Sequence, residues 1–350
     1  MTKRPTIKDV AKQAGVSIAT VSFVLNNHPG EVISEKVKKR VWAAARQLEY
    51  HPSAAAAGLA RKRTRNVAIV FYLDDSTVSN QFYSFVIQGA IKEAMLREHH
   101  LLFSFIDHPY KTVGDLPKVI REHNAEGVMF IQHTHPKLVR DIQQRGFPVV
   151  AVDHHPPVKD LDSLQIDNRR GGELAAEHLL ELGHARLAVL QAAVDRPSIA
   201  ERVQGFRMAL EAHGVAFAPR ANVIDCDSLT FESAHERMLG VLRTNRDLTA
   251  LFCANDEMAA GAIRAAYESG LDVPGDLSVV GFDDIIMSRY THPPLTTVGV
   301  DKEQLGRRAM SRLLDLVEGK DGKCRRETVP VALVVRRSTA KPRARRKASV

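Results

Sequence analysis

Six polar residues and one aromatic residue have side chains suited to binding a small ligand. Most follow short apolar segments, and Arg202 precedes an amphipathic one; the set is Asp75, Phe82, Gln132, Asp153, Arg202, Asn255 and Asp283. Carboxylates, amides and a guanidinium form paired hydrogen bonds, which a ligand with many hydroxyl groups can satisfy. Arg202 and Asp283 are the principal candidates. Phe82 and its neighbour Tyr83 can stack on a sugar or base, although aromatic residues at helical spacing more often belong to the protein core.

The sequence carries no recognisable signature of catalysis or metal binding. It contains no GxSxG, P-loop, GxGxxG, HExxH or CxxC motif. His133 and His135 are the candidate metal-binding pair, but no cysteine or carboxylate motif lies nearby. Asp256 is as well explained by capping a helix as by contacting a ligand. We therefore predict that the protein is not an enzyme and that it needs no metal or cofactor.

The segments that position these residues alternate between apolar runs and amphipathic stretches. One set of apolar runs lies at 67–73, 101–106, 127–132 and 149–153, and a second at 186–192, 222–226, 249–255 and 277–284. This alternation predicts two doubly wound α/β lobes with parallel sheets, whose ligand groups lie at the carboxyl ends of the strands. We place an N-lobe at about 66–163 plus 292–323 and a C-lobe at about 164–291 plus 324–338. A closing strand is expected at 329–335.

A different pattern occupies the start of the chain. Thr6 can cap a first helix that ends at Gly15, and Ser17 can cap a second, so the stretch from Thr6 to Asn26 predicts a helix-turn-helix. A third amphipathic segment at 34–48 closes a small core. In the DNA-binding interpretation the second helix enters the major groove, with contacts from Thr6, Ser17, Ile18, Ala19, Thr20, Ser22, Phe23 and Asn26. An ordinary helical hairpin is the alternative.

The distribution of charge separates the same regions. Residues 1–65 hold 13 Lys or Arg against 4 Asp or Glu, whereas residues 66–335 hold 29 against 37, and the last 15 residues hold 7 against none. A basic head on an acidic body is typical of a DNA-binding domain attached to another function.

Several longer motifs resemble the lactose and galactose repressor (LacI/GalR) family of bacterial transcription regulators. They are TIKDVAKQAGVSIATVSFVLN, YHPSAAAAGLA, ERVQGF, FCANDEMAAGAIRAAYESGLDVPGDLSVVGFDD and YTHPPLTTV. The resemblance implies a helix-turn-helix domain at 1–50, a hinge helix and linker at 51–65, and a periplasmic-binding-protein-like effector domain at 66–338. Residues 339–350 form a basic tail that we expect to be disordered.

The resemblance also implies functional contacts. Family members bind near-palindromic operators as dimers, and Leu59 matches the hinge leucine that wedges between base pairs in the minor groove. Asp153, Arg202, Asn255 and Asp283 match positions that contact small-molecule effectors. The tail has no leucine heptads of the kind that join dimers into tetramers, so we expect a homodimer.

The second helix departs from the family pattern at three positions. Phe23 stands where the family often has arginine, and Ile18 and Ala19 stand where polar residues are common. Losing that arginine removes a bidentate contact to guanine, whereas apolar side chains contact thymine methyl groups. We therefore predict half-sites that are recognised partly through thymine.

The sequence thus predicts a repressor of sugar uptake or catabolism genes, whose operator affinity is controlled by a sugar or sugar derivative. A purine or nucleoside effector remains an alternative, and a secreted sugar receptor is a more distant one. We find no secretory signal or membrane-spanning run, and three scattered cysteines fit reduced thiols. We therefore expect a cytoplasmic protein, associated with the nucleoid when bound to DNA and without a membrane partner.

Overall fold

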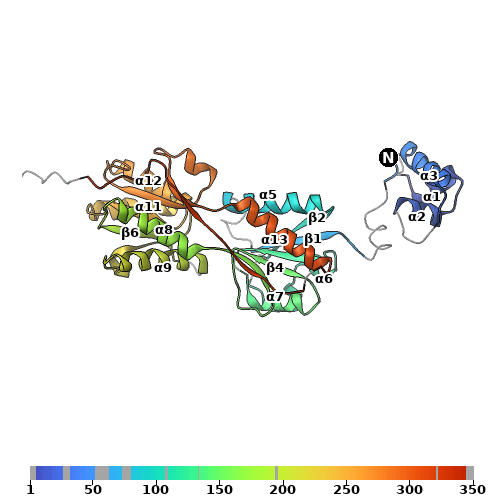
Figure 1. The fold of residues 1–350 in the computed structure, drawn as a ribbon, viewed down its shortest axis with the longest axis horizontal. Coiled ribbons are helices and arrows are strands. Elements are labelled where there is room, and N and C mark those ends of the chain that lie inside the picture. Colours follow the sequence, from blue (N-terminus) through green and yellow to red (C-terminus); the bar gives the residue numbers. More distant parts are fainter. Residues whose placement is uncertain are drawn as a thin grey trace, which may run out of the picture. The chain divides into compact units, whose positions relative to one another are not determined.

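The computed structural model divides the chain into two compact units, Met1–Arg65 and Asn66–Val350. The structure describes residues 5–26, 32–51, 63–72, 80–106, 109–132, 134–193, 196–320 and 322–343 (Figure 1). Three of the residues singled out from the sequence, Leu59, Asp75 and His133, lie outside these ranges. No helix within the described residues combines the length and the apolar character needed to cross a membrane.

The first unit is a bundle of three helices whose ends are fixed by the expected caps. Its helices are α1 (Ile7–Ala14), α2 (Ile18–Leu25) and α3 (Glu35–Gln47). The Asp9 carboxylate accepts hydrogen bonds from the Thr6 amide at 2.8 Å and from its hydroxyl at 2.7 Å. Gly15 ends α1 with φ of 62°, and the Ser17 hydroxyl accepts from the Thr20 amide at 3.0 Å. The predicted helix-turn-helix is therefore confirmed as a fold.

Arg40 of α3 holds the turn between α1 and α2. Its Nε donates to the Ala14 carbonyl at 3.0 Å, and its Nη2 donates to the Gly15 carbonyl at 3.0 Å. These carbonyls belong to a helix end, where backbone oxygens have no partner within the helix. The core beneath the turn is formed by Val10, Val21 and Val41, which are fully buried.

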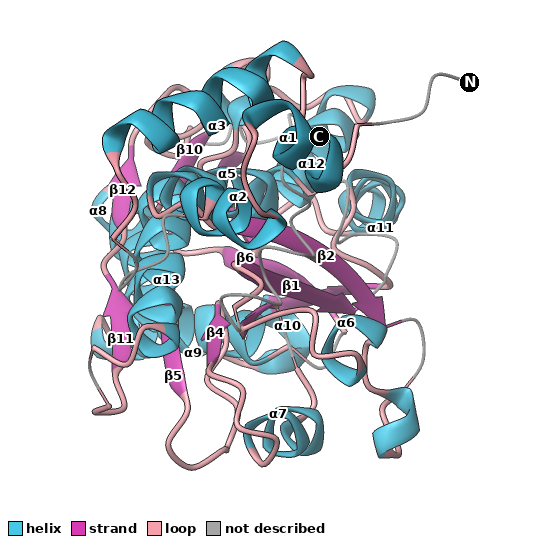
Figure 2. Cartoon of the chain, turned by 90° about the vertical axis from the view of Figure 1, so that its right-hand side faces the viewer, coloured by secondary structure: helices cyan, strands magenta, loops and turns pink. Residues whose placement is uncertain are grey.

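The second unit contains two six-stranded sheets, each of which forms a lobe, and helices flank the strands (Figure 2). In the N-lobe the strand order is β11-β5-β4-β3-β1-β2, and every pairing is parallel. The bounds are β1 (Asn66–Tyr72), β2 (His100–Ile106), β3 (Gly127–Ile131), β4 (Val149–Val152), β5 (Asp162–Ile166) and β11 (Arg326–Val329). The associated helices are α5 (Gln81–Leu96), η1 (Val113–Asp115), α6 (Lys118–Arg121), α7 (Pro136–Gln143) and α13 (Lys302–Val317).

The C-lobe sheet has the order β12-β10-β9-β8-β6-β7, and only its edge pair β10–β12 is antiparallel among the described pairings. Its strands are β6 (Leu187–Ala192), β7 (Val223–Cys226), β8 (Ala250–Cys253), β9 (Ser278–Asp283), β10 (Thr296–Gly299) and β12 (Ala332–Val334). Its helices are α8 (Asn168–Glu181), α9 (Pro197–Ala212), α10 (Pro219–Asn222), α11 (Phe231–Thr244), α12 (Asp256–Glu268) and η2 (Ile286–Arg289). The predicted fold class is confirmed.

The lobes exchange strands at points that differ from the expected ranges. The expected closing strand at 329–335 is two strands, and β11 joins the N-lobe sheet although 324–338 was assigned to the C-lobe. Likewise β10 joins the C-lobe sheet although 292–323 was assigned to the N-lobe. Pro330 explains the break, because proline has no N–H to donate to a strand ladder. The chain therefore crosses between the sheets after β5, after β10 and after β11.

Glycines bring two pairs of helices into close contact, one pair in each lobe. A Cβ atom at Gly306 of α13 would lie 1.8 Å from the Val86 carbonyl oxygen of α5, and one at Gly89 would lie 2.0 Å from the Glu303 carbonyl oxygen. In the C-lobe, Gly172 of α8 approaches the Arg202 carbonyl of α9 in the same way. Larger residues at these positions would force the backbones apart.

This packing predicts opposite effects for the same substitution at two helical glycines. Gly306→Ala should lower the free energy of unfolding by about 2–3 kcal/mol, because the added methyl meets backbone that cannot move aside alone. Gly240→Ala in α11 has open space around the new methyl. It should raise the free energy of unfolding by about 0.5–1 kcal/mol through helix propensity. Urea unfolding of the two variants beside the wild type measures both; equal shifts would contradict the close packing of α5 and α13.

Candidate functional site

The Arg202 side chain lies buried in the C-lobe, with a protein oxygen against each of its nitrogens. Its Nε donates to Asn168 Oδ1 at 2.9 Å, its Nη1 donates to the Ala254 carbonyl at 2.6 Å, and its Nη2 lies 3.4 Å from Asp283 Oδ1. The guanidinium carbon stands 3.6 Å from the centre of the Phe282 ring. Only 5% of the residue is exposed. A buried charge is tolerated when it is paired in this way, so Arg202 has a fixed position.

Asp153 follows β4 and supplies a carboxylate from the N-lobe. The Tyr83 hydroxyl donates to its Oδ2 at 3.2 Å. Its Oδ1 is buried and has no hydrogen-bond partner among the described residues. Burial raises the pKa of Asp153 to about 6, with Arg202 acting against this rise and the Asp283 carboxylate adding to it. Oδ1 is therefore an acceptor that a ligand hydroxyl or amine can satisfy.

We define the interlobe pocket as the space lined by Phe82, Tyr83, Asp153, Arg202 and Asp283, together with Asn80, Arg196, Ser198, Ile199, Leu229 and Asn255. The structure thus brings together Phe82, Asp153, Arg202, Asn255 and Asp283 from the predicted set. Gln132 is buried after β3 but does not line this pocket, and Asp75 lies outside the described residues. Volume within the pocket is about 30 Å³. That is room for two or three waters, since each needs roughly 10–15 Å³.

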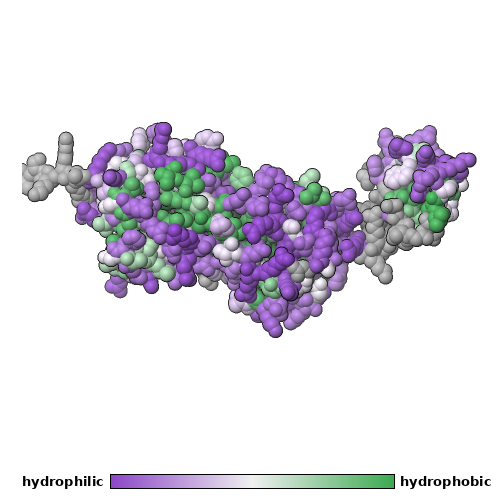
Figure 3. Space-filling model, in the orientation of Figure 1, coloured by the Kyte–Doolittle hydropathy of each residue, from purple (hydrophilic) through white to green (hydrophobic). Residues whose placement is uncertain are grey.

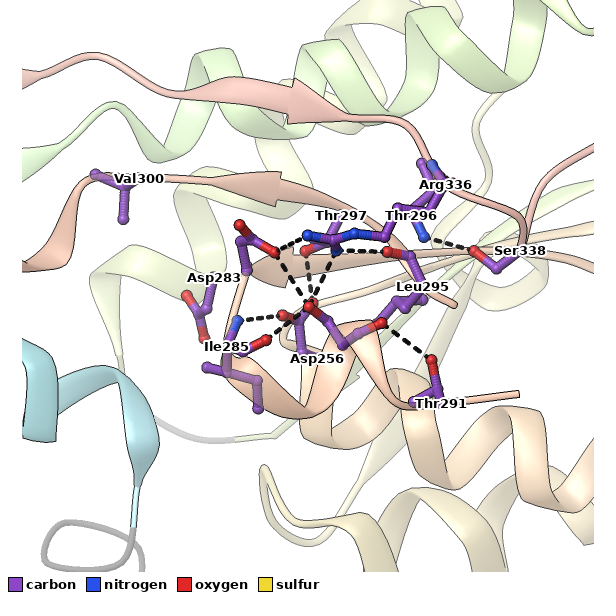
Figure 4. A network of polar contacts seen from close by, with 12 residues as sticks. Asp256, Asp283, Ile285, Thr291, Leu295, Thr296, Thr297, Val300, Arg336 and Ser338 are labelled. Atoms are coloured by element: carbon purple, nitrogen blue, oxygen red, sulfur yellow. Dashed lines mark hydrogen bonds and ion pairs between the residues drawn. The ribbon is translucent and has the colours of Figure 1, made fainter. Parts of the chain in front are cut away.

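Asn255 and Asp256 have structural partners that differ from the expected ones. Asn255 caps α12, because its Oδ1 accepts from the Met258 amide at 2.8 Å while its Nδ2 donates to the Leu229 carbonyl at 3.0 Å. Asp256, for which a helix cap and a ligand contact were both open, is instead the first residue of the helix. Its buried carboxylate accepts from the Thr297 hydroxyl at 2.5 Å and from the Ile285 amide at 2.9 Å (Figure 4).

The turn after β9 is held by two cations that the sequence did not single out. Asp283 and Asp284 both have positive φ, 104° and 49°. The Lys302 ammonium donates to their carbonyls at 2.5 and 3.1 Å. Arg336 pairs with the Asp284 carboxylate at 2.5 Å and donates to the Ser288 hydroxyl at 3.0 Å. These contacts fix an unusual backbone conformation next to the carboxylate that pairs with Arg202.

Asn168 and Lys302 are members of the site that sequence reasoning missed, and Tyr83 was weighed beside Phe82 only as a stacking surface or a core residue. Tyr83 follows Phe82 at the start of a helix, where an aromatic residue is usually part of the core. Asn168 and Lys302 begin helices after Asp167 and Asp301, both of which are caps. No sequence motif marks any of the three, because their partners come from segments distant in the chain.

In the first unit, α2 presents apolar side chains to solvent. Ile18 is 44% exposed, Ala19 is exposed and Phe23 is half-buried. The polar candidates mostly make local contacts: the Thr20 and Ser17 hydroxyls lie 2.9 Å apart, and Asn26 Nδ2 donates to the Ser22 carbonyl at 2.9 Å. Thr6 caps α1 rather than standing free.

Within the described residues, no group of three or more His, Cys, Asp or Glu side chains is arranged to hold a metal ion. Cys226 and Cys253 are buried and Cys324 is exposed, and all three are free thiols. Burial raises the pKa of Cys226 to about 11 and holds the pKa of Cys253 well above its ordinary value. The two buried thiols are therefore protonated and unreactive at neutral pH.

Both units of the chain match known protein families. Residues 6–53 match the model "Bacterial regulatory proteins, lacI family", and residues 176–339 match "Periplasmic binding protein-like domain". The chain is 34% identical over 342 residues to the HTH-type transcriptional repressor PurR of Mannheimia succiniciproducens, covering 96% of this chain and 99% of that protein. It is also similar to the lac repressor dimer bound to operator and the anti-inducer ONPF, with TM-score 0.83, 29% identity and coverage of 97% and 100%. A transcriptional regulator CelR–cellobiose complex gives TM-score 0.71, 28% identity and coverage of 96% and 100%.

The raised pKa of Asp153 predicts that the wild type and an Asp153→Asn variant differ in how their stability depends on pH. Between its ordinary value of 3.8 and about 6, the folded protein keeps a proton that the unfolded chain releases. The stabilising contribution of this group is therefore complete below pH 4 and is lost as pH rises through 6. Asp153→Asn should remove this decline, so the unfolding free energy of the variant relative to wild type should rise by up to about 3 kcal/mol from pH 4 to pH 7.

Urea unfolding at several pH values measures this difference, because subtracting the two curves cancels the other titrating groups. Asp160→Asn makes the same chemical change at a side chain that is 76% exposed, and it should give a flat difference. A flat difference for Asp153→Asn as well would contradict the assignment.

Proposed function

This chain belongs to the lacI family of bacterial regulatory proteins, which are DNA-binding regulators rather than enzymes, and we propose that it represses transcription under the control of a neutral sugar. In this proposal α2 binds the major groove of a palindromic operator, and the sugar binds in the interlobe pocket. The protein acts in the cytoplasm on sugar uptake or catabolism genes.

The observation that carries the ligand class is the balance of charge in the interlobe pocket. Two carboxylates, Asp153 and Asp283, face two guanidiniums, Arg196 and Arg202. Their formal charges cancel, which favours a neutral ligand over a phosphate or a carboxylate. Asp153 Oδ1 has no hydrogen-bond partner among the described residues, and a sugar hydroxyl can donate a hydrogen bond to it. The CelR complex with cellobiose supports the same class in a similar protein.

Control of DNA affinity would follow from movement between the lobes. The interlobe pocket holds about 30 Å³, so a sugar enters only when the lobes separate. The chain crosses between the sheets three times, after β5, β10 and β11, and these crossings can bend together. A ligand that binds one lobe arrangement more tightly shifts the population toward it. We propose that the hinge segment, with Leu59 at its wedge position, carries that shift to the operator.

A homodimer is supported by an apolar surface on the N-lobe. Phe103 and Phe105 of β2 are 48% and 47% exposed, and Met95 and Leu96 of α5 are each 71% exposed. β2 is an edge strand, and edge strands with apolar faces are prone to pair with another chain. Hydrophobic residues also gather over the C-lobe around α12 on a mostly hydrophilic face (Figure 3). We propose that the β2 and α5 surface contributes to the dimer interface.

A purine or nucleoside is the second candidate for the effector. The Phe82 and Tyr83 rings line the pocket with their centres 5.0 Å apart and nearly perpendicular. A flat base can stack on such rings, and its amino groups can donate to Asp153.

Selection from a randomised palindromic library tests the proposed function. The full-length protein should select a symmetric site with thymine facing Ile18 and Ala19, and Ile18→Ala should relax that thymine preference. One neutral sugar should change operator affinity by about tenfold, a typical coupling between sites. The added panel contains D-glucose, D-galactose, cellobiose, lactose, glucose 6-phosphate, hypoxanthine and guanosine.

Each other outcome has a distinct meaning. Failure to select any site at low salt would contradict the DNA-binding function. A response to hypoxanthine or guanosine alone would replace the sugar with a purine. A response to glucose 6-phosphate alone would contradict the charge-balance argument.

A further inference from the structure

A second and larger cavity lies where the chain passes between the two lobes. We call it the hinge cavity; its volume is about 580 Å³. Side chains from the end of β4, the start of α8, the start of α9 and β11 line it, among them His155, Asn168, Glu201 and Thr328. Small-molecule sites commonly enclose roughly 300–1,000 Å³, so this volume can hold a sugar ring with its hydration.

The hinge cavity adjoins the interlobe pocket. Asp153 and Ser198 line both spaces, one from each lobe. Asp153 has two carboxylate oxygens, of which Oδ2 accepts from Tyr83 and Oδ1 has no partner within the described residues. A ligand in either space can therefore contact Asp153.

Two residues that line the hinge cavity have a buried polar atom without a hydrogen-bond partner among the described residues. His155 Nδ1 is buried and, like Asp153 Oδ1, makes no hydrogen bond to any residue that the structure describes. Buried polar atoms in native proteins are nearly always hydrogen-bonded to protein, water or ligand. Asp153 and His155 line the cavity, so a turn of either side chain would bring its unpartnered atom to an entering molecule, beside the Thr328 and Ser198 hydroxyls.

The charge of the lining selects against anions. Three carboxylates, Asp153, Asp167 and Glu201, line the hinge cavity against one guanidinium, Arg169. Glu201 Oε2 is held as an acceptor by Gln165 Nε2 at 2.6 Å and by Asn168 Nδ2 at 3.2 Å. An excess of acceptors suits hydroxyl groups and repels phosphate.

We propose that the effector is a neutral saccharide of at least two rings, with one ring in the interlobe pocket and the next in the hinge cavity. This inference rests on the proposed function and specifies the size of its ligand. The glycosidic bond would pass between Asp153 and Ser198, and the second ring would contact His155 and Thr328.

Isothermal titration calorimetry on the full-length protein compares single rings with their dimers. The probes are D-glucose, D-galactose, cellobiose, maltose, lactose and melibiose. At least one disaccharide should bind about tenfold or more tightly than either of its component sugars, because the second ring adds contacts.

A bulky residue in the hinge cavity then locates the second ring. Thr328 is exposed on the edge strand β11, where a larger side chain does not disturb the core. Thr328→Trp should weaken disaccharide binding by about tenfold and leave any monosaccharide binding within about twofold. Thr244→Trp, the same change at an exposed position on α11, is the control and should alter neither. His155→Ala, which removes a partner without adding bulk, should weaken the disaccharide alone and serves as the test if Thr328→Trp does not fold.

The possible results distinguish a failure of the two-ring effector from a failure of the proposed sugar-controlled regulator. A monosaccharide that binds as tightly as every disaccharide would overturn the two-ring effector and leave the sugar-controlled regulator intact. Disaccharide binding that neither Thr328→Trp nor His155→Ala weakens would also overturn it, because the second ring would lie elsewhere. If no saccharide binds, both this inference and the proposed sugar effector fail. Selection of an operator from the DNA library still tests DNA binding independently.

Discussion

The buried guanidinium of Arg202 is the constraint on which the candidate site depends. A charge with so little exposure must find partners inside the protein, and here they come from three places: the start of α8, the end of β8 and the end of β9. Gly172 of α8 lies against the backbone carbonyl of Arg202 in α9, and the Arg202 guanidinium lies over the Phe282 ring. The C-lobe side of the pocket is therefore a connected structure rather than a collection of loops.

The N-lobe side is less completely bonded. Asp153 has one oxygen on Tyr83 and one without a partner in the described chain, and burial raises the pKa of this carboxyl to about 6. The two sides are joined through Lys302, which holds the carbonyls after β9 and begins α13. α13 packs against α5, the helix that carries Phe82 and Tyr83 (Figure 1). A change at the β9 turn thus has a direct mechanical route to the N-lobe.

Local patterns predicted much of this structure. The caps at Thr6 and Ser17, the glycine turn at Gly15 and the alternating apolar runs are short-range signals, and the elements formed where they indicated. Asp283 was expected at the end of a strand and lies there, whereas Arg202 was expected to precede a helix and instead lies within α9 (Pro197–Ala212). The closing strand is split at Pro330, which has no N–H to donate. This residue is visible in the sequence, but the apolar residues around it suggested one continuous strand.

Other features depend on contacts between distant segments, which periodicity does not encode. Asn255 and Asp256 are both plausible caps by type, and only the partners Thr297 and Ile285 decide that Asp256 is the buried carboxylate. Lys302 lies 19 residues beyond Asp283 and was indistinguishable from an ordinary helix-start lysine. The hinge cavity is likewise assembled from strand and helix ends of both lobes.

The most direct measurement is the effect of the effector on operator affinity, followed by fluorescence anisotropy, in Arg202→Lys and in Arg207→Lys. Both residues lie on α9, but Arg207 is an exposed side chain paired only with the neighbouring Glu211 among the described contacts. Lysine cannot reproduce the three-sided hydrogen bonding of the buried guanidinium. The account predicts that Arg202→Lys loses the response by about tenfold or more while Arg207→Lys keeps it. An Arg202→Lys protein that responds like the wild type would contradict the central place of this interaction.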